Sequence, residues 1–329
     1  MKIRISSIIL LAPLFCLCGC QPKVESERPV IQFVSDIIQD RSSAGHQLLD
    51  SFKQKDPGGN IVICGPQEEV SSLAFSLFLS DNFDNVDARP VRDSLLDFSG
   101  EVISRVVIKD EGPLNTFETE EGAERLRELT VKAALACLDT LSYRTLSDMS
   151  SYSHKSKGKV LVLSSSAMAA YGKYDLDSLL RVFNIQDVVF FPLELMAEKV
   201  AGDEDTRVGI VSSKPKKLYE EFFKYQPDFE GSLIGVYPKE MVLDSVSVVD
   251  TMALDVLLLD DYSVRADTLR ARFPKIQVLD PGKVVNEACF KAMRRRNIFT
   301  HRVAYPKWEG FSAILNEDSE FILTDSDDR

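Results

Sequence analysis

The sequence predicts an α/β protein with parallel sheets, arranged in two doubly wound lobes. From residue 158 onward, short apolar runs that suit buried strands alternate with amphipathic stretches that suit helices. This alternation is typical of a parallel sheet covered by helices on both faces. The chain of 329 residues also exceeds the usual size of one domain, which favours two lobes with sizeable cores.

The elements before residue 158 follow a less regular order. Residues 61–64 form a fully apolar run between Gly59 and Gly65, as expected of a strand buried on both faces. Residues 120–141 carry apolar side chains at helical spacing and predict an amphipathic helix. The remaining expectations are an extended run or helix from residue 30 that breaks near 41–45, weak patterning over 81–119 and a serine-rich loop over 147–158.

Beyond residue 158 the pattern is regular enough to assign each element. The expected strands are residues 160–163, 188–191, 208–211, 233–236, 256–259 and 276–279. The expected helices are residues 166–182, 193–201, 215–225, 263–273 and 284–295. In doubly wound sheets, ligands bind beyond the carboxyl ends of such strands, where helices begin.

Residues 1–19 resemble the signal peptide of a bacterial lipoprotein. Lys2 and Arg4 precede an apolar run over 8–17, and a Leu-Cys-Gly-Cys segment ends at Cys20. The run is shorter than the roughly 20 residues of a membrane-spanning helix, which disfavours a membrane anchor or a buried first helix. We therefore expect cleavage before Cys20 and lipidation of its thiol.

Lipid on Cys20 would hold the protein on a membrane without a spanning helix. Stable anchoring takes two or more chains, such as palmitate. Residues 20–29 are polar and predict a lipidated tether before the folded domain. We expect the cell envelope of a Gram-negative bacterium as the location, on the inner or outer membrane, with the soluble domain in the periplasm.

Composition excludes several classes of partner. The formal net charge of −12 disfavours nucleic acid. The sequence has no phosphate-binding loop, no GxGxxG and no zinc-type spacing, so we expect no cofactor and no metal. The acidic runs at 260–261 and 325–328 are candidate cation sites, but a solvated charge run explains the second better.

The cysteines and histidines that remain in the mature chain predict structural roles. Cys64, Cys137 and Cys289 lie in apolar strand-like or helical stretches and have no CxxC spacing, so we expect three buried free thiols. The histidines are single and scattered, which favours surface or structural roles over a catalytic base or a metal ligand. They are His46, His154 and His301.

Two strand-to-helix turns carry a resemblance to a known family. The first is VLVLSSSAMAA over residues 160–170, and the second is LLLDDYS over residues 257–263. Their order and spacing resemble the aspartate/glutamate racemase superfamily, whose two pseudo-symmetric lobes each carry a catalytic cysteine on such a turn. Residues 208–213 and 269–285 are similar to further segments of the family. Near the start, Asp40 can be laid over the aspartate of its DSGxGG segment.

The resemblance implies where the two lobes begin and end and which residues stand at the two catalytic positions. It implies a first lobe of residues 30–200 completed by 281–329, and a second lobe of residues 205–280. It also places Ser165 and Asp261 where the two catalytic cysteines would be. A serine hydroxyl is not a base unaided, and a carboxylate is a weak one, so we do not expect two-thiol racemisation. The chain is interpreted as a racemase-like pseudoenzyme.

The cleft itself would remain a binding site. Ser165 and Ser166 would present hydroxyl and backbone N–H groups at the start of a helix, and Ser213 and Asp261 would lie on the other lobe. We expect these residues to bind a small anionic ligand, or the cleft to take an envelope protein partner.

Three other functions stay open on the sequence. An isomerase or hydrolase would use Asp261 as a base with Ser165 or Asp40 nearby. A type I periplasmic-binding protein would share the two-lobed plan, with three strand crossings between lobes. A scaffold lipoprotein would keep the fold alone.

Overall fold

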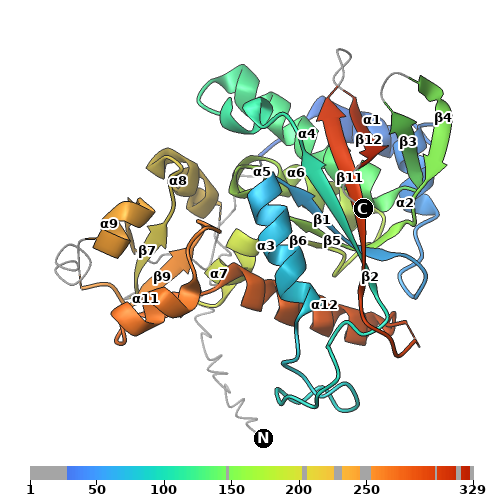
Figure 1. Ribbon diagram of the computed structural model, residues 1–329. Helices are drawn as coiled ribbons and strands as arrows, with labels where there is room; N and C mark the ends of the chain where they lie inside the picture. The colour runs from blue at the N-terminus through green and yellow to red at the C-terminus, as the bar shows by residue number, and fades with distance from the viewer. Residues whose placement is uncertain are drawn as a thin grey trace, which may run out of the picture.

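Two sheets organise the chain (Figure 1). The computed structural model describes residues 28–145, 148–201, 206–225, 232–244, 253–300, 302–315 and 320–326. The expected signal peptide, Cys20 and His301 lie outside these residues, as does nearly all of the expected tether. Among the described helices, none is long and apolar enough to cross a membrane.

The larger sheet is mostly parallel and confirms the predicted α/β class. Its strand order is β4-β3-β12-β11-β2-β1-β5-β6, with antiparallel pairing only within β11–β12 and β3–β4 among the described pairs. Every residue of the central strands β1 and β5 is buried, as their apolar runs predict. The bounds are β1 (Asn60–Gly65), β2 (Val102–Ile108), β3 (Leu141–Thr145), β4 (Asp148–His154), β5 (Gly158–Leu163), β6 (Val189–Phe190), β11 (Lys307–Leu315) and β12 (Phe321–Asp325).

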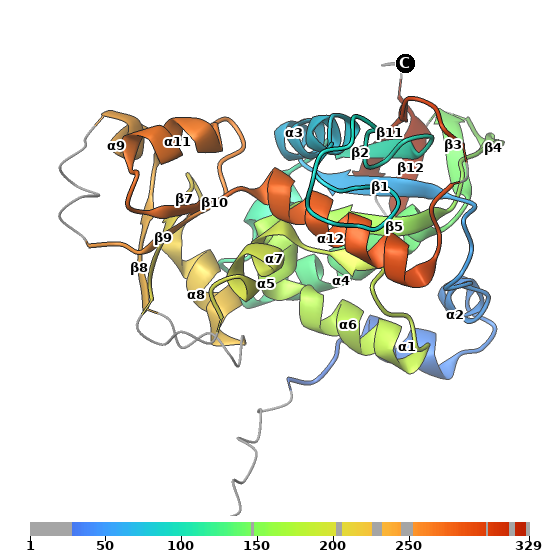
Figure 2. The same ribbon diagram turned by 90° about the horizontal axis from the view of Figure 1, so that it is seen from below.

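Helices cover both faces of this sheet (Figures 1 and 2). One face carries α3 (Gln67–Phe78) and α12 (Pro281–Arg296), and the other carries α4 (Glu120–Leu138), α5 (Ser166–Tyr171) and α6 (Lys173–Val182). Such two-sided coverage is typical of parallel strands joined by helical crossovers. The peripheral elements are α1 (Gln32–Gln39), α2 (Ala44–Asp50) and the short 3-10 helix η1 (Gly112–Asn115). The mostly buried α7 (Pro192–Glu198) packs against α12 and α5.

The smaller sheet is parallel throughout, in the order β10-β9-β7-β8. Its helix α8 packs against α5 of the larger unit, so one hydrophobic core includes residues beside both sheets. The bounds are β7 (Arg207–Val211), α8 (Lys216–Lys224), β8 (Ser232–Tyr237), α9 (Lys239–Asp244), β9 (Val256–Leu259), α11 (Ala266–Arg272) and β10 (Gln277–Leu279).

The chain passes between the sheets twice. It leaves the larger sheet after α7 and returns after β10, and the described strands of the smaller sheet all lie between Arg207 and Leu279. These strands fall inside the segment 205–280 that the sequence suggested for a second lobe. Two passages rather than three argue against the plan of a type I periplasmic-binding protein.

Some elements differ from the sequence-based expectation. The serine-rich stretch expected as a loop contains β4, which pairs with β3 at the edge of the larger sheet. The weakly patterned stretch 81–119 contains β2, where Ser104 and Arg105 interrupt the apolar run. The long helix expected over 166–182 is divided at Gly172, where a β-carbon would lie 2.2 Å from Thr130 Oγ1 of α4. Close packing of α4 therefore requires glycine at this break.

A buried ion pair holds the start of the folded domain. Asp175 of α6 accepts hydrogen bonds from Arg127 Nε at 2.7 Å and from Ile31 N at 2.9 Å. Arg127 of α4 also donates to Pro29 O at 2.7 Å. The Asp175 side chain is fully buried. The chain is therefore fastened to two core helices immediately before α1 begins.

Candidate functional site

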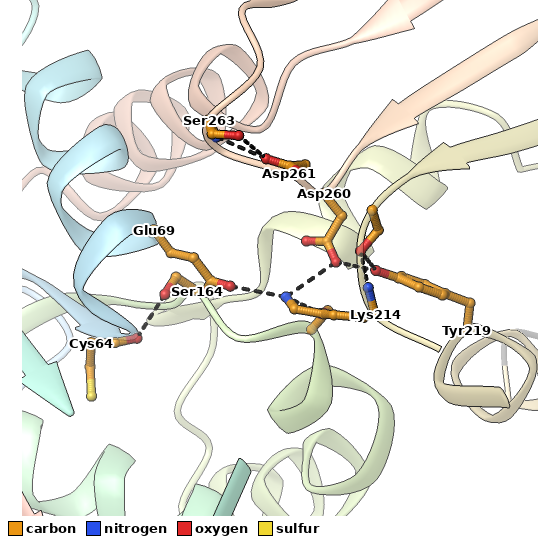
Figure 3. Close-up of polar contacts among 10 residues, drawn as sticks. Cys64, Glu69, Ser164, Lys214, Tyr219, Asp260, Asp261 and Ser263 are labelled. Atoms are coloured by element: carbon orange, nitrogen blue, oxygen red, sulfur yellow. Dashed lines mark hydrogen bonds and ion pairs between the residues drawn. The ribbon is translucent and has the colours of Figure 1, made fainter. Parts of the chain in front are cut away.

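Lys214, which follows β7, lies between the carboxyl ends of strands from both sheets (Figure 3). Its ammonium donates to Glu69 Oε1 of α3 at 2.9 Å and to Ser166 Oγ of α5 at 2.7 Å. It also donates to Asp260 Oδ2, which follows β9 in the smaller sheet, at 3.4 Å. One cation therefore connects residues beside the larger sheet with residues of the smaller one.

Tyr219 of α8 and Ser212 extend this network. The Tyr219 hydroxyl donates to Asp260 Oδ2 at 2.5 Å and lies 2.6 Å from Ser212 Oγ. The backbone N–H of Lys214 donates to the same Ser212 Oγ at 3.0 Å. Because Tyr219 and Asp260 are both buried, these bonds hold one oxygen of the Asp260 carboxylate in place.

The surroundings set the protonation of the network. Burial raises the pKa of Glu69; Lys214 opposes this effect and the nearby Asp260 carboxylate adds to it. Burial alone would lower the pKa of Lys214, but Asp260 and Glu69 outweigh it and raise that pKa above its ordinary value. Burial also raises the pKa of Tyr219 well above its ordinary value. At neutral pH Lys214 is thus an ammonium and Tyr219 a phenol, which suits neither to act as a base.

A cleft of about 300 Å³ lies beside the network. Its lining includes six acidic residues, which are Glu68, Glu69, Glu111, Glu240, Asp260 and Asp261. Its two basic lining residues are Lys214, which the carboxylates already engage, and Lys239, which donates to Ser263 Oγ at 2.8 Å. The charge of this lining argues against the small anion that the sequence suggested, because like charges repel.

The structure brings most of the sequence-predicted site residues to this cleft. Ser165, Ser213 and Asp261 line it, and Ser166 accepts the hydrogen bond from Lys214. Ser165 is buried at the start of α5, and Asp261 accepts bonds from the backbone and hydroxyl of Ser263 at 3.0 and 2.5 Å. Asp261 therefore closes a local turn, whereas its neighbour Asp260 is the buried carboxylate of the network.

Asp40, the third catalytic candidate, is not part of this site. It is exposed, does not line the cleft and accepts hydrogen bonds from the backbone and hydroxyl of Ser42 at 2.8 and 2.6 Å. These bonds lower the pKa of Asp40. The structure therefore does not bring Asp40 to the cleft that Ser165 and Asp261 line, and Asp40 instead stabilises the turn between α1 and α2.

Sequence reasoning missed the residues at the centre of the network. Glu69 of α3 lies 145 positions before Lys214, and Tyr219 follows Lys214 in α8, so no local sequence pattern connects Glu69 with the other two. Asp260 was visible on the second turn, but the sequence did not show which of the two adjacent aspartates points inward. The only available signal was position, because Glu69 and Lys214 each closely follow an apolar strand.

The three cysteines are buried and free, as predicted. A hydrogen bond with Cys137 and burial raise the pKa of the Cys64 thiol well above its ordinary value, and burial raises that of Cys289 to about 12. His46 hydrogen-bonds through Nδ1 to Ile37 O at 2.9 Å, which is a structural role. Within the described ranges, no group of His, Cys, Asp and Glu side chains is placed to hold a metal ion.

Comparisons with known proteins give structural similarity only. No protein-family model and no curated protein matches the chain. Glutamate racemase from Thermus thermophilus, solved with β-chloro-D-alanine, is 13% identical, with a TM-score of 0.47 over 81% of this chain and 91% of that one. The maleate isomerase Iso from Pseudomonas putida S16 is 12% identical, with a TM-score of 0.41 over 72% and 93%. PH1733, an aspartate racemase homologue from Pyrococcus horikoshii OT3, is 11% identical, with a TM-score of 0.39 over 73% and 99%. A glutamate racemase and an aspartate racemase homologue are thus among the solved structures to which this chain is similar.

Proposed function

We propose that the protein is an envelope lipoprotein that binds a small ligand in the cleft and does not racemise it. This proposal rests on which residues line the cleft. Ser165 and Asp261 occupy the two positions where the resemblance would place thiols, and Lys214, which is held as an ammonium, connects Glu69 and Asp260.

Two-base proton exchange needs groups that can each take and give a proton across the ligand. Ser165 has no base among its hydrogen-bonding partners in the described chain, and Asp261 is engaged by Ser263. The three free thiols are buried outside the cleft lining. A cleft with a fixed polar network and no paired thiols suits binding better than α-proton transfer.

We predict no α-proton exchange in deuterated water for amino acids or small dicarboxylates. The purified protein from residue 21 onward is incubated with each compound, and loss of the α-proton signal is followed by NMR. An Asp261→Asn variant serves as the matched sample and should behave identically. Exchange by the wild type that this variant loses would support an isomerase instead, an alternative favoured by the presence of Ser165 and Asp261 in one cleft.

The lipid anchor is tested separately. We expect the wild-type protein to fractionate with membranes and a Cys20→Ser variant to be released, because one thiol carries all of the expected acylation. Mass spectrometry of the amino-terminal peptide should show acyl chains on Cys20. An unmodified Cys20 in the membrane fraction would remove the lipoprotein part of the proposal.

A further inference from the structure

Three polar atoms beside the cleft lack a hydrogen-bond partner within the described chain: Glu69 Oε2, Asp260 Oδ1 and the Tyr262 hydroxyl. All three residues line the cleft, and the side chains of Glu69 and Asp260 are 8% and 1% exposed. Buried polar groups are nearly always hydrogen-bonded, and a carboxylate oxygen left without a donor is costly. These atoms therefore make this part of the cleft suited to a ligand that donates hydrogen bonds.

Lys214 does not satisfy these atoms. Its ammonium uses the other oxygen of each carboxyl group, Glu69 Oε1 and Asp260 Oδ2, and its third bond goes to Ser166. Figure 3 shows the carboxyl groups of Glu69 and Asp260 directed toward one another around Lys214. Both carboxyl groups therefore lie within hydrogen-bonding distance of one ammonium, each with its second oxygen unpartnered. Two carboxylates with one lysine also leave a net negative charge.

The mouth of the cleft adds further negative charge. Glu68, Glu111 and Glu240 are exposed lining residues that form no ion pair within the described part of the chain. The lining also includes buried apolar side chains, among them Leu114, Phe117 and Leu218. A lining that combines buried carboxylates, exposed carboxylates and apolar side chains fits a short aliphatic chain with a cation at each end.

We propose that the cleft binds a small aliphatic diamine, with one primary ammonium held by Glu69, Asp260 and Tyr262. A primary ammonium has three N–H donors and no acceptor, which matches three unpartnered oxygen atoms. Its charge balances the inner group, and its second ammonium lies near the acidic mouth. The inference rests on the proposed binding function and names the ligand class for the same cleft.

The experiment is isothermal titration calorimetry of the protein from residue 21 onward with 1,4-diaminobutane. Butylamine, succinate and Mg²⁺ are titrated in parallel under the same buffer and salt. We expect saturable binding of the diamine, weaker binding of butylamine, and no binding of succinate. Saturable binding of succinate without the diamine would overturn the diamine inference but keep the binding function. If none of the four compounds binds, the diamine inference is overturned. If α-proton exchange is also observed, the proposed function is overturned as well.

Variants locate the ammonium. Glu69→Gln should weaken diamine binding about tenfold to a hundredfold, because it removes a charged hydrogen-bond acceptor. Tyr262→Phe should weaken it less, since it removes one neutral oxygen. Glu121→Gln, an exposed change in the first turn of α4, is the matched control and should leave affinity unchanged. Equal affinities for Glu69→Gln and Glu121→Gln would place the ammonium elsewhere.

The wild-type protein provides a test that does not depend on a variant folding. Burial raises the pKa of Glu69, and a bound ammonium would stabilise its ionised form. Diamine binding should therefore release protons and strengthen as pH rises through the pKa of Glu69 in the free cleft. Titrations in two buffers of different ionisation enthalpy measure the released protons. Proton uptake on binding, or competition by Mg²⁺ at equal concentration, would contradict the assignment.

Discussion

Replacing Lys159 by methionine will lower the free energy of unfolding by about 3 to 5 kcal/mol, because it leaves a buried carboxylate without its cation. Lys159 Nζ lies 2.6 Å from Glu101 Oε2, and the two side chains are 2% and 1% exposed. Lys159 also donates to Pro57 O and Ile298 O, at 3.0 and 2.9 Å. Urea unfolding at neutral pH, followed by circular dichroism, measures the loss.

Two further variants separate the charge effect from lost packing. Lys159→Met combined with Glu101→Leu should recover much of the loss, since a buried ion pair is often replaceable by apolar side chains of similar size. Arg207→Ala, which breaks the exposed pair with Asp255, should cost much less than the loss at the buried pair, because water screens exposed charges. Equal losses at the buried and exposed pairs would mean that burial does not determine the effect.

Lys214→Met should destabilise the protein by about 3 kcal/mol at neutral pH, at the lower end of the range for a buried pair. The side chain is 26% exposed, so water replaces part of what is lost. The variant leaves Glu69 and Asp260 close together without a cation. The double variant with Glu69→Gln should recover stability, because one negative charge is then removed.

The loss in Lys214→Met should depend on pH in a defined direction. Burial raises the folded-state pKa of Glu69, so the protonated form stabilises the fold at low pH, and this contribution is lost as pH rises through that pKa. Without Lys214 the pKa rises further. The difference from wild type should therefore be small in acid and grow toward neutral pH, and a difference independent of pH would exclude Glu69 as its source.

The sequence predicted the fold class because its strands are short apolar runs, and each central one is buried on both faces as such runs require. It did not predict β4, because the strand is rich in serine and lies at a sheet edge, where pairing rather than burial defines it.

The candidate site was predicted in place but not in detail. Ser165 and Asp261 were identified from turns that follow strands, and both line the cleft. The cluster at its centre depends on Glu69 and Lys214, which are 145 positions apart and meet only when the two sheets come together. Which aspartate is buried depends on the tight turn from Asp261 to Ser263, a backbone geometry that the residue types alone do not determine.

The bonds from Asp175 and Arg127 to the start of the chain determine how a pulling force would enter the molecule. Arg127 of α4 binds Pro29 and Asp175 of α6 binds Ile31, so a force applied at the amino end acts on these two helices before it can stretch α1. Of these two helices, α4 packs directly on the larger sheet and α6 packs on α4, so resistance comes from the centre of the fold. A pull at this point would therefore be resisted by two core helices before the chain could unravel from α1.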